Sequence, residues 1–205
     1  MSLSVGLGQI WYAKNCFNMK WIKSYNQALL ESSNQDELDK RLLAAAEKGD
    51  IEEVRNLLDR GAEVDSRNRG GETPLHKAAK NGHIEVARLL LDRGARIDAV
   101  DGFKMTPLHW AAWSGRSGVA ILLLYKGARV DAEDHFKRAP LYKAVDHGHR
   151  ETAKLFILHG EDPTKAFNSM EVFNGFFGGD LSWYEGDLDE LERRFKANLI
   201  RKKLF

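Results

Sequence analysis

Cysteine is almost absent from this chain, which has 205 residues and a single thiol, Cys16. One cysteine excludes an intrachain disulfide and a zinc site built from several thiolates. The lack of disulfides suits a reducing compartment, so we expect an intracellular protein, cytoplasmic or nuclear. No apolar run approaches the roughly 20 residues that a membrane span needs. The first 20 residues hold neither a continuous apolar segment nor an arginine, so we expect no signal or transit peptide.

An excess of one charge is also absent. Lys and Arg number 31 and Asp and Glu number 30, which gives a formal net charge of +1. This balance gives no electrostatic reason to expect nucleic acid or a membrane surface as the main partner. The hydrophobic share of 43% and the charged share of 30% are ordinary for a soluble globular protein, so we do not expect extensive disorder.

Motifs of known enzyme classes are missing too. The sequence has no P-loop, dinucleotide-binding glycine fingerprint, nucleophile elbow or HExxH motif. His147 and His149, with His135 and Asp146 near them in the sequence, raise the question of a metal site. Residues two apart diverge on a helix, however, and no pair four apart completes a ligand set. We therefore expect no catalytic residue, cofactor, metal or small-molecule substrate.

The sequence repeats with a period of 33 residues. "TPLHKAAKNGH" begins at Thr73, "TPLHWAAWSGR" at Thr106 and "APLYKAVDHGH" at Ala139. Two series of glycines keep the same step: Gly49, Gly82, Gly115 and Gly148, and Gly61, Gly94, Gly127 and Gly160. A fixed period of this length is the signature of a repeat architecture.

Each repeat is predicted to contain two short helices. Pro74 stands where the first helix should begin, a position that tolerates proline, and Thr73 precedes it as a cap. Gly82 ends this helix, and a second one is predicted over 84–93 because its apolar residues have helical spacing. Gly94 closes the second helix, and a hairpin-like turn leads on. A single unit cannot bury its own apolar side, so the units must stack.

These features resemble the ankyrin repeat. The family pattern "TPLHxAAxxGHxEVAxLLLxxGAxxDA" is nearly complete in Thr73–Ala99, and four units are readable over about 39–163, most of the chain. The resemblance implies an all-α solenoid of stacked helix–turn–helix units with β-hairpin-like turns. It also implies that the tetrapeptide histidines, His76 and His109, make structural hydrogen bonds, and that His83 and His149 are structural.

The ends of the chain depart from the repeat. Residues 1–38 are predicted to be an N-terminal extension whose Trp21, Ile22, Tyr25 and Leu29 have helical spacing, so we expect one helix packed on the first repeat, after a mobile start over Met1–Gln9. Four repeats occupy 39–168. Residues 169–205 are predicted to be a degenerate fifth unit, a C-terminal cap entered through a longer loop, "NGFFGGD". Its last helix places apolar residues on one stripe: Leu188, Leu191, Phe195 and Leu199.

The C-terminal run "RRFKANLIRKKLF" is basic and amphipathic, which leaves two interpretations open. It is either a site for anionic membrane or nucleic acid, or a final helix whose cations interact favourably with its own C-terminal dipole.

The third repeat divides by helical face. At about 100° per residue, Leu108, Ala111 and Ala112 share the core side, whereas Trp110 and Trp113 lie opposite. The resemblance makes that opposite side a concave groove in which the family contacts its partners. Carried over position by position, it predicts these partner-binding residues: Arg69, Glu72, Lys80, Asn81, Phe103, Met105, Trp110, Trp113, Ser114, His135, Phe136, Arg138, Asp146 and His147.

The groove of the third repeat is unusually apolar. We expect Phe103, Met105, Trp110 and Trp113 to lie close together with Phe136 beside them, and aromatic residues and methionine are enriched at interfaces. The alternative for Trp110, and less so for Trp113, is that the ring leans on neighbouring repeats and covers the core. The sequence thus predicts a protein-binding module or adaptor, monomeric when alone, with nucleic acid or membrane as the less favoured partner.

The same units break local rules. Lys104 and Lys137 stand where the second repeat has Gly71, a turn position that favours glycine, at a cost on the order of 1 kcal/mol each. Gly118 lies inside a predicted helix and costs roughly 1 kcal/mol relative to alanine. Ala139 replaces a capping threonine. Such departures are expected at functional sites.

Overall fold

A computed structural model describes the backbone of residues 5–167 and 170–195, and the side chains from Ile22 onward within them except those of residues 30, 31 and 33. The basic run after Phe195, with Leu199, lies outside the described residues, as does the start of the chain before Val5. Neither interpretation of the C-terminal run is therefore tested.

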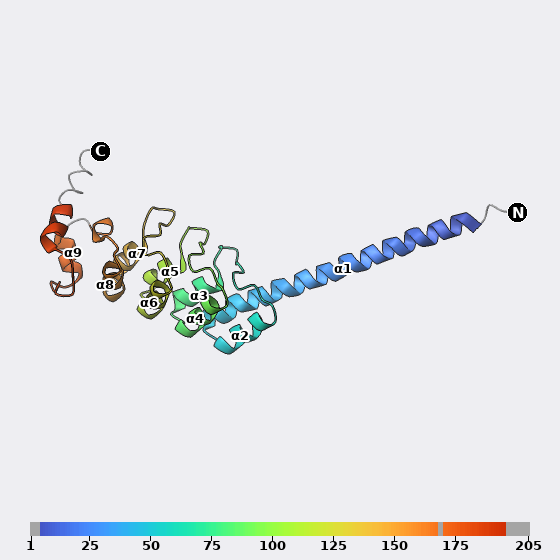
Figure 1. Ribbon diagram of the computed structural model, residues 1–205, viewed down its shortest axis with the longest axis horizontal. Coiled ribbons are helices and arrows are strands. Elements are labelled where there is room, and N and C mark those ends of the chain that lie inside the picture. The colour runs from blue at the N-terminus through green and yellow to red at the C-terminus, as the bar shows by residue number, and fades with distance from the viewer. Residues whose placement is uncertain (1–4, 168–169, 196–205) are drawn as a thin grey trace, which may run out of the picture.

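The described chain is built from helix pairs (Figure 1). The pairs are α1 (Val5–Lys48) with α2 (Ile51–Asp59), α3 (Pro74–Asn81) with α4 (Ile84–Asp92), α5 (Pro107–Trp113) with α6 (Ser117–Tyr125), and α7 (Pro140–Asp146) with α8 (Arg150–Leu158). The first helices pack side by side in the order α1, α3, α5, α7, and the second helices follow in a parallel layer. Among the described residues there is no strand, so the predicted all-α solenoid is confirmed.

The loops that join one pair to the next project to the same side, the upper side in Figure 1. We call the loops between α2 and α3, α4 and α5, and α6 and α7 the tips. Backbone hydrogen bonds link successive tips: the Gly102 N–H donates to the Gly70 carbonyl at 2.8 Å, and the His135 N–H donates to the Phe103 carbonyl at 2.9 Å. The tips are therefore fixed relative to one another.

The first helices begin as the sequence predicts. The Thr106 side chain accepts a hydrogen bond from the His109 N–H, and Pro107 occupies the first helical position. Ala139, the counterpart of this threonine at the start of α7, makes no capping bond. Gly82 ends α3 with φ +86°, a left-handed conformation that glycine adopts without steric cost.

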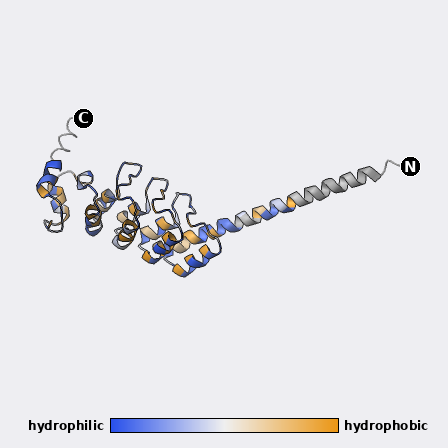
Figure 2. Ribbon diagram, viewed as in Figure 1, coloured by the Kyte–Doolittle hydropathy of each residue, from blue (hydrophilic) through white to orange (hydrophobic). Residues whose placement is uncertain are grey.

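The core lies between the two helix layers. Four leucines spaced 33 residues apart, Leu42, Leu75, Leu108 and Leu141, are almost completely buried, and Figure 2 shows hydrophobic residues along the helices of the stack. Burial of each such side chain is worth about 2 kcal/mol. Because these residues pack against the next repeat, stacking and folding are the same event.

The N-terminal extension differs from the prediction. It is no separate helix packed on the first repeat: α1 runs without a break into the first repeat and projects from the end of the array (Figure 1). Ile22, Tyr25 and Leu29 are about half exposed, and the first buried side chain is Leu38. The physical reason is that no glycine or proline interrupts residues 9–48, so nothing stops the helix.

The C-terminal unit is built around aromatic rings. It contains a short 3-10 helix, η1 (Pro163–Lys165), then α9 (Met170–Phe176), and residues 188–195 are helical as well. Phe173 is fully buried and its ring centroid lies 5.1 Å from that of Phe167. The predicted loop "NGFFGGD" is partly wrong, because its first three residues belong to α9. Leu191 and Phe195 are buried, whereas Leu188 is exposed.

The strained turns predicted from the two lysines are confirmed. Lys104 has φ +58° and Lys137 has φ +61°, in the left-handed region that Gly71 occupies in the tip before them. All three residues close the same kind of turn, and the Lys104 N–H donates to the Asp101 carbonyl at 3.1 Å. Gly118 also has a packing reason, since an added Cβ would lie 2.7 Å from Ile84 Cδ1.

We predict that Lys104→Gly stabilises the protein by about 0.5–1 kcal/mol, because relief of the left-handed strain exceeds the entropy that glycine adds to the unfolded chain. Chemical denaturation of both proteins measures the difference. Arg69→Gly is the control, because Arg69 also lies on a tip but does not itself have a positive φ; this change should lower stability. Equal effects of the two substitutions would show that the turn stores no strain.

Candidate functional site

Two buried histidines join neighbouring repeats. The Thr106 N–H donates to His109 Nδ1 at 3.2 Å, so the ring proton is on Nε2, which bonds the Arg138 carbonyl at 3.0 Å. His76 repeats this arrangement with Thr73 and with the Met105 carbonyl. Each imidazole thus ties a helix start to the next tip, which confirms the structural role that the resemblance implied.

The histidines that follow the helix-ending glycines also bridge repeats. His83 Nε2 lies 3.0 Å from the Glu47 carbonyl oxygen, and His149 Nε2 lies 3.1 Å from that of Trp113. Both bonds reach back to the end of the preceding first helix. These four histidines are therefore committed to the scaffold, and among the described residues no group of three His, Cys, Asp or Glu side chains is placed to hold a metal ion.

A buried carboxylate shapes each of the last two tips. Asp101 Oδ1 accepts the N–H groups of Phe103 and Met105 at 2.8 and 2.9 Å. Asp134 makes the same pair of bonds one repeat later. Burial would raise the pKa of Asp134, but its hydrogen bonds, first that with Lys143, outweigh burial and hold the pKa below its usual value. These contacts fix where the tip side chains emerge.

Trp110 is part of this tip scaffold. Its indole Nε1–H donates to Asp101 Oδ2 at 2.9 Å. At the equivalent position of the next repeat, the Lys143 ammonium lies 2.8 Å from Asp134 Oδ2. Trp110 therefore replaces a lysine as the donor to a buried carboxylate, which supports the alternative that this residue mainly completes the repeat.

Trp113 presents its ring to solvent. It is 38% exposed and lies in edge contact with Trp110, with ring centroids 5.5 Å apart, and with His147 at 5.2 Å. Lys80 Nζ lies 4.6 Å from the Trp110 ring centroid and 5.6 Å from that of Trp113, within cation–π range. We call Lys80, Trp110, Trp113 and His147 the groove cluster; its members come from the ends of three successive first helices.

The tip phenylalanines form a second exposed group. Phe103 and Phe136 are each 63% exposed and lie on tips that the His135 N–H links. The Arg138 guanidinium carbon lies 4.5 Å from the Phe136 ring centroid and 5.1 Å from that of Tyr142. Tyr142 was not predicted as a site residue, although the sequence marks it, since tyrosine there replaces the histidine of the two preceding repeats.

The predicted grouping of four apolar residues is wrong for Met105. This residue is 7% exposed and its backbone is engaged by His76 and Asp101, so it belongs to the core side and is no surface anchor. The left-handed residue Lys104 lies between the two and breaks the alternation of the chain, so that Met105 turns inward while Phe103 remains exposed. Only the two tryptophans of the proposed four are in ring contact among the described residues.

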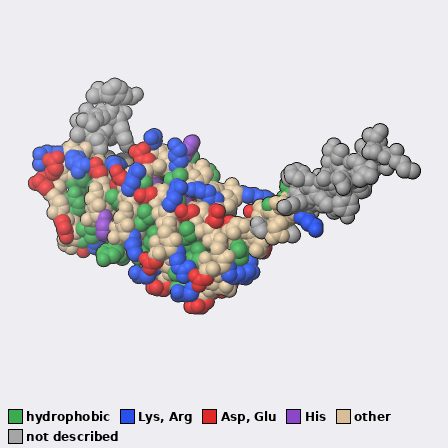
Figure 3. Space-filling model, turned by 45° about the vertical axis from the view of Figure 1, so that its right-hand side comes forward, with side chains coloured by type: hydrophobic (Ala, Val, Ile, Leu, Met, Phe, Trp, Pro, Cys, Tyr) green, Lys and Arg blue, Asp and Glu red, His purple; other side chains and the backbone are tan. Residues whose placement is uncertain are grey.

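The predicted polar residues frame the cluster to different degrees. Arg69, His135 and Asp146 are exposed, whereas Asn81 and Ser114 are half-buried. Glu72 is paired with Lys77 at 2.8 Å; burial would raise the pKa of Glu72, but the hydrogen bonds with Lys77 and Asn68 lower it overall. A hollow of about 590 Å³ between α1 and the first tip includes Arg69 in its lining. Figure 3 shows basic side chains on the upper, tip side and on the lower side of this view, interspersed with acidic ones.

Comparison with known proteins identifies the repeat. A family model described as ankyrin repeats, three copies, matches residues 42–134. Residues 42–134 are therefore ankyrin repeats. A search of curated proteins finds no match. Ankyrin repeats generally mediate protein–protein interactions and the family is typically non-catalytic. No helix in the described part of the chain is long and apolar enough to cross a membrane.

The bridging histidines predict acid sensitivity. Burial lowers the pKa of His76 and His109 below the ordinary value of 6.5, so the unfolded chain takes up these protons at a higher pH than the folded chain does. Their contribution to stability is therefore complete above about pH 6.5 and is lost as the pH falls toward the folded pKa. Denaturation between about pH 7 and 5 measures this slope.

A His76→Gln, His109→Gln double variant is the control, because glutamine does not titrate. It should be less stable at every pH, yet its stability should depend less on pH over this interval. An unchanged slope would assign the acid sensitivity to other groups.

Proposed function

We propose that this protein is a non-catalytic interaction module or adaptor, intracellular and monomeric when alone, that binds a protein partner on the surface formed by the first helices and the tips. The observation that carries the proposal is the groove cluster. Trp113 is neither needed to build its repeat nor covered by it, whereas the equivalent residues Lys80 and Asp146 are polar. A large aromatic ring at this place is typical of an interface anchor.

The exposed rings supply apolar contact and the tips supply orientation. Trp113, Phe103 and Phe136 would be the anchors, and Trp110 would support Trp113 from its fixed place on Asp101. Arg69, Lys80 and Arg138 would form a polar rim with Asp146. Because hydrogen bonds from backbone and carboxylate fix the tips, little ordering would be lost on binding, and preorganisation of this kind favours affinity.

The less favoured function, association with anionic membrane or nucleic acid through the C-terminal run, rests on residues outside the described part of the chain. Binding to anionic vesicles or DNA that weakens with salt and disappears when Arg201–Lys203 are removed would support it. The division of the chain at residues 38 and 168 is an interpretation of the repeat pattern, and α1 crosses the first of these boundaries without a break.

Affinity capture with matched variants tests the proposed groove. Trp113→Ala should weaken partner binding by about 2–4 kcal/mol with little change in thermal stability. The control is Tyr125→Ala, which removes an aromatic ring that is 86% exposed at the end of α6, in the other helix layer. A partner recovered with the wild type and the control but not with Trp113→Ala would then be titrated against all three proteins.

Two results would count against the groove. If Trp113→Ala binds the titrated partner as tightly as the wild type, the anchor is assigned wrongly. If Tyr125→Ala is equally impaired, the partner lies on the second-helix layer instead.

A further inference from the structure

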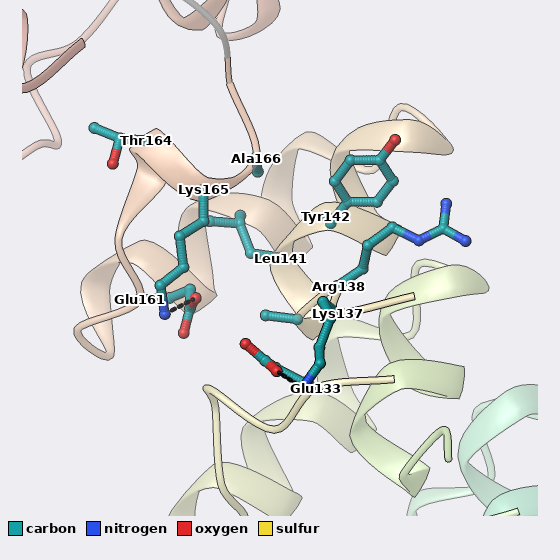
Figure 4. Close-up of a pocket in the computed structure, with 10 residues that line it drawn as sticks. Glu133, Lys137, Arg138, Leu141, Tyr142, Glu161, Thr164, Lys165 and Ala166 are labelled. Atoms are coloured by element: carbon teal, nitrogen blue, oxygen red, sulfur yellow. Dashed lines mark ion pairs between the residues drawn. The ribbon is translucent and has the colours of Figure 1, made fainter. Parts of the chain in front are cut away.

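A pocket of about 460 Å³ opens where the array of regular repeats ends (Figure 4). Its walls come from the last tip, from α7 and from the segment around η1. The next tip of a regular array would stand here, but the chain instead turns into η1 after Glu161–Asp162. The hollow is thus a consequence of the irregular fifth unit.

Three residues that line this pocket depart from the repeat pattern. Tyr142 replaces the bridging histidine, and Ala139 replaces the capping threonine. Glu161 replaces an alanine that is buried in the other three repeats, and its N–H donates to the Phe156 carbonyl at 3.0 Å as those alanines bond their own helices. The backbone keeps the repeat while the side chains that would have filled or bridged the space have changed.

Glu161 is the most unusual of the three. Its side chain is 1% exposed, and Oε1 has no hydrogen-bond partner; the Lys165 ammonium lies 3.4 Å away. Burial raises the pKa of Glu161 and outweighs the Lys165 ammonium, which lowers it, and the carboxylates of Asp131 and Asp162 add to the rise. A buried carboxylate oxygen that accepts no hydrogen bond costs stability, so alanine at this position should stabilise the fold relative to glutamate.

A second carboxylate lines the same pocket. Glu133 comes from the last tip and lies 3.2 Å from the Lys137 ammonium, and Figure 4 shows each glutamate beside its own lysine. The lysine side chains are 83% and 56% exposed for Lys137 and Lys165. Pairs with such exposed lysines are weak, so an incoming cation can displace them at little cost.

We propose that this pocket binds an arginine side chain of the protein partner, with Glu161 and Glu133 accepting hydrogen bonds from the guanidinium. The inference rests on the proposed function, because it assigns one residue type to the partner. A guanidinium presents five donors in a planar fork and is more weakly hydrated than an ammonium, so it can serve carboxylates from two segments. Leu141, Ala139 and Tyr142 provide apolar walls for its stem.

The pocket continues the proposed groove. Arg138 lines the pocket and also lies over the ring of Phe136, a proposed anchor. A partner segment that contacts Phe136 would therefore reach the pocket within a few residues. The hydrogen bonds of Asp134 fix the backbone of the last tip at Phe136 and Arg138. They therefore also fix the spacing between Phe136 and the pocket that a partner segment would have to span.

Amide NMR on the full chain tests the pocket with a small probe, N-acetyl-arginine amide. We expect shifts centred on Tyr142, Glu161 and Lys165 that saturate in the millimolar range. N-acetyl-citrulline amide, which has the same shape without the charge, should bind at least about tenfold more weakly. Glu161→Gln should abolish the arginine-dependent shifts, whereas Trp113→Ala should leave them unchanged.

The alternative ligands are arms of the same titration. Stronger binding of N-acetyl-aspartate amide would show that the lysines, and not the glutamates, determine the ligand, and would overturn the inference. Equal binding of the citrulline probe, or the absence of saturable shifts at the pocket, would do the same. None of these results bears on the proposed binding groove, which is tested separately by the effect of Trp113→Ala on partner binding.

Thermal unfolding separates a functional glutamate from a structural one. Glu161→Ala restores the residue type of the other repeats and should raise the melting temperature by several degrees, while it removes arginine binding. A lower melting temperature would mean that Glu161 is there to hold the fold, and would overturn its assignment to the pocket.

Discussion

The stack depends on a buried imidazole that binds its own helix start and the next repeat together. In His76 and His109, Nδ1 accepts from the capping threonine and Nε2 donates to a carbonyl one tip further on. Both ring nitrogens are engaged in this way, so each ring fixes the position of one repeat relative to the next. The leucines between the layers supply most of the stabilisation, but they do not specify direction. The imidazole bonds do, because hydrogen bonds need defined geometry.

The same bridge explains where the regular array stops. In the fourth repeat the histidine is replaced by Tyr142 and its capping threonine by Ala139, and the next tip is missing. The end of the array is instead covered by the packing of Phe167, Phe173 and neighbouring rings in the C-terminal unit. A cap built from aromatic rings buries apolar surface without requiring repeat geometry. It leaves a pocket on the tip side, where a further repeat would otherwise have filled the space.

Structural and candidate binding roles share the short helix α5 and lie one turn apart. Trp110 donates a hydrogen bond to the buried carboxylate of Asp101. Trp113, three residues later, packs its ring against the rings of Trp110 and His147. The scaffold thereby holds an exposed ring in one orientation. Lys104 and Lys137 show the opposite balance, because their left-handed backbone costs free energy and the exposed ion pair of Lys137 with Glu133 is too weak to offset it. Some departures from the repeat pattern therefore gain a contact and others only strain the backbone, and the surrounding residues show which of the two applies.

The sequence by itself determined the repeat, its helices and its turns, because glycine, proline and threonine act through local backbone chemistry. It also predicted the strain at Lys104, which follows from register alone. The tertiary structure decided what depended on partners distant in sequence. Met105 turned inward, and the Trp110 indole came to donate to Asp101. Glu161 came to lie buried in a pocket that Glu133 also lines, and its Oε1 accepts no hydrogen bond there. Helical spacing gives the direction of a side chain, but only the folded chain shows what it meets.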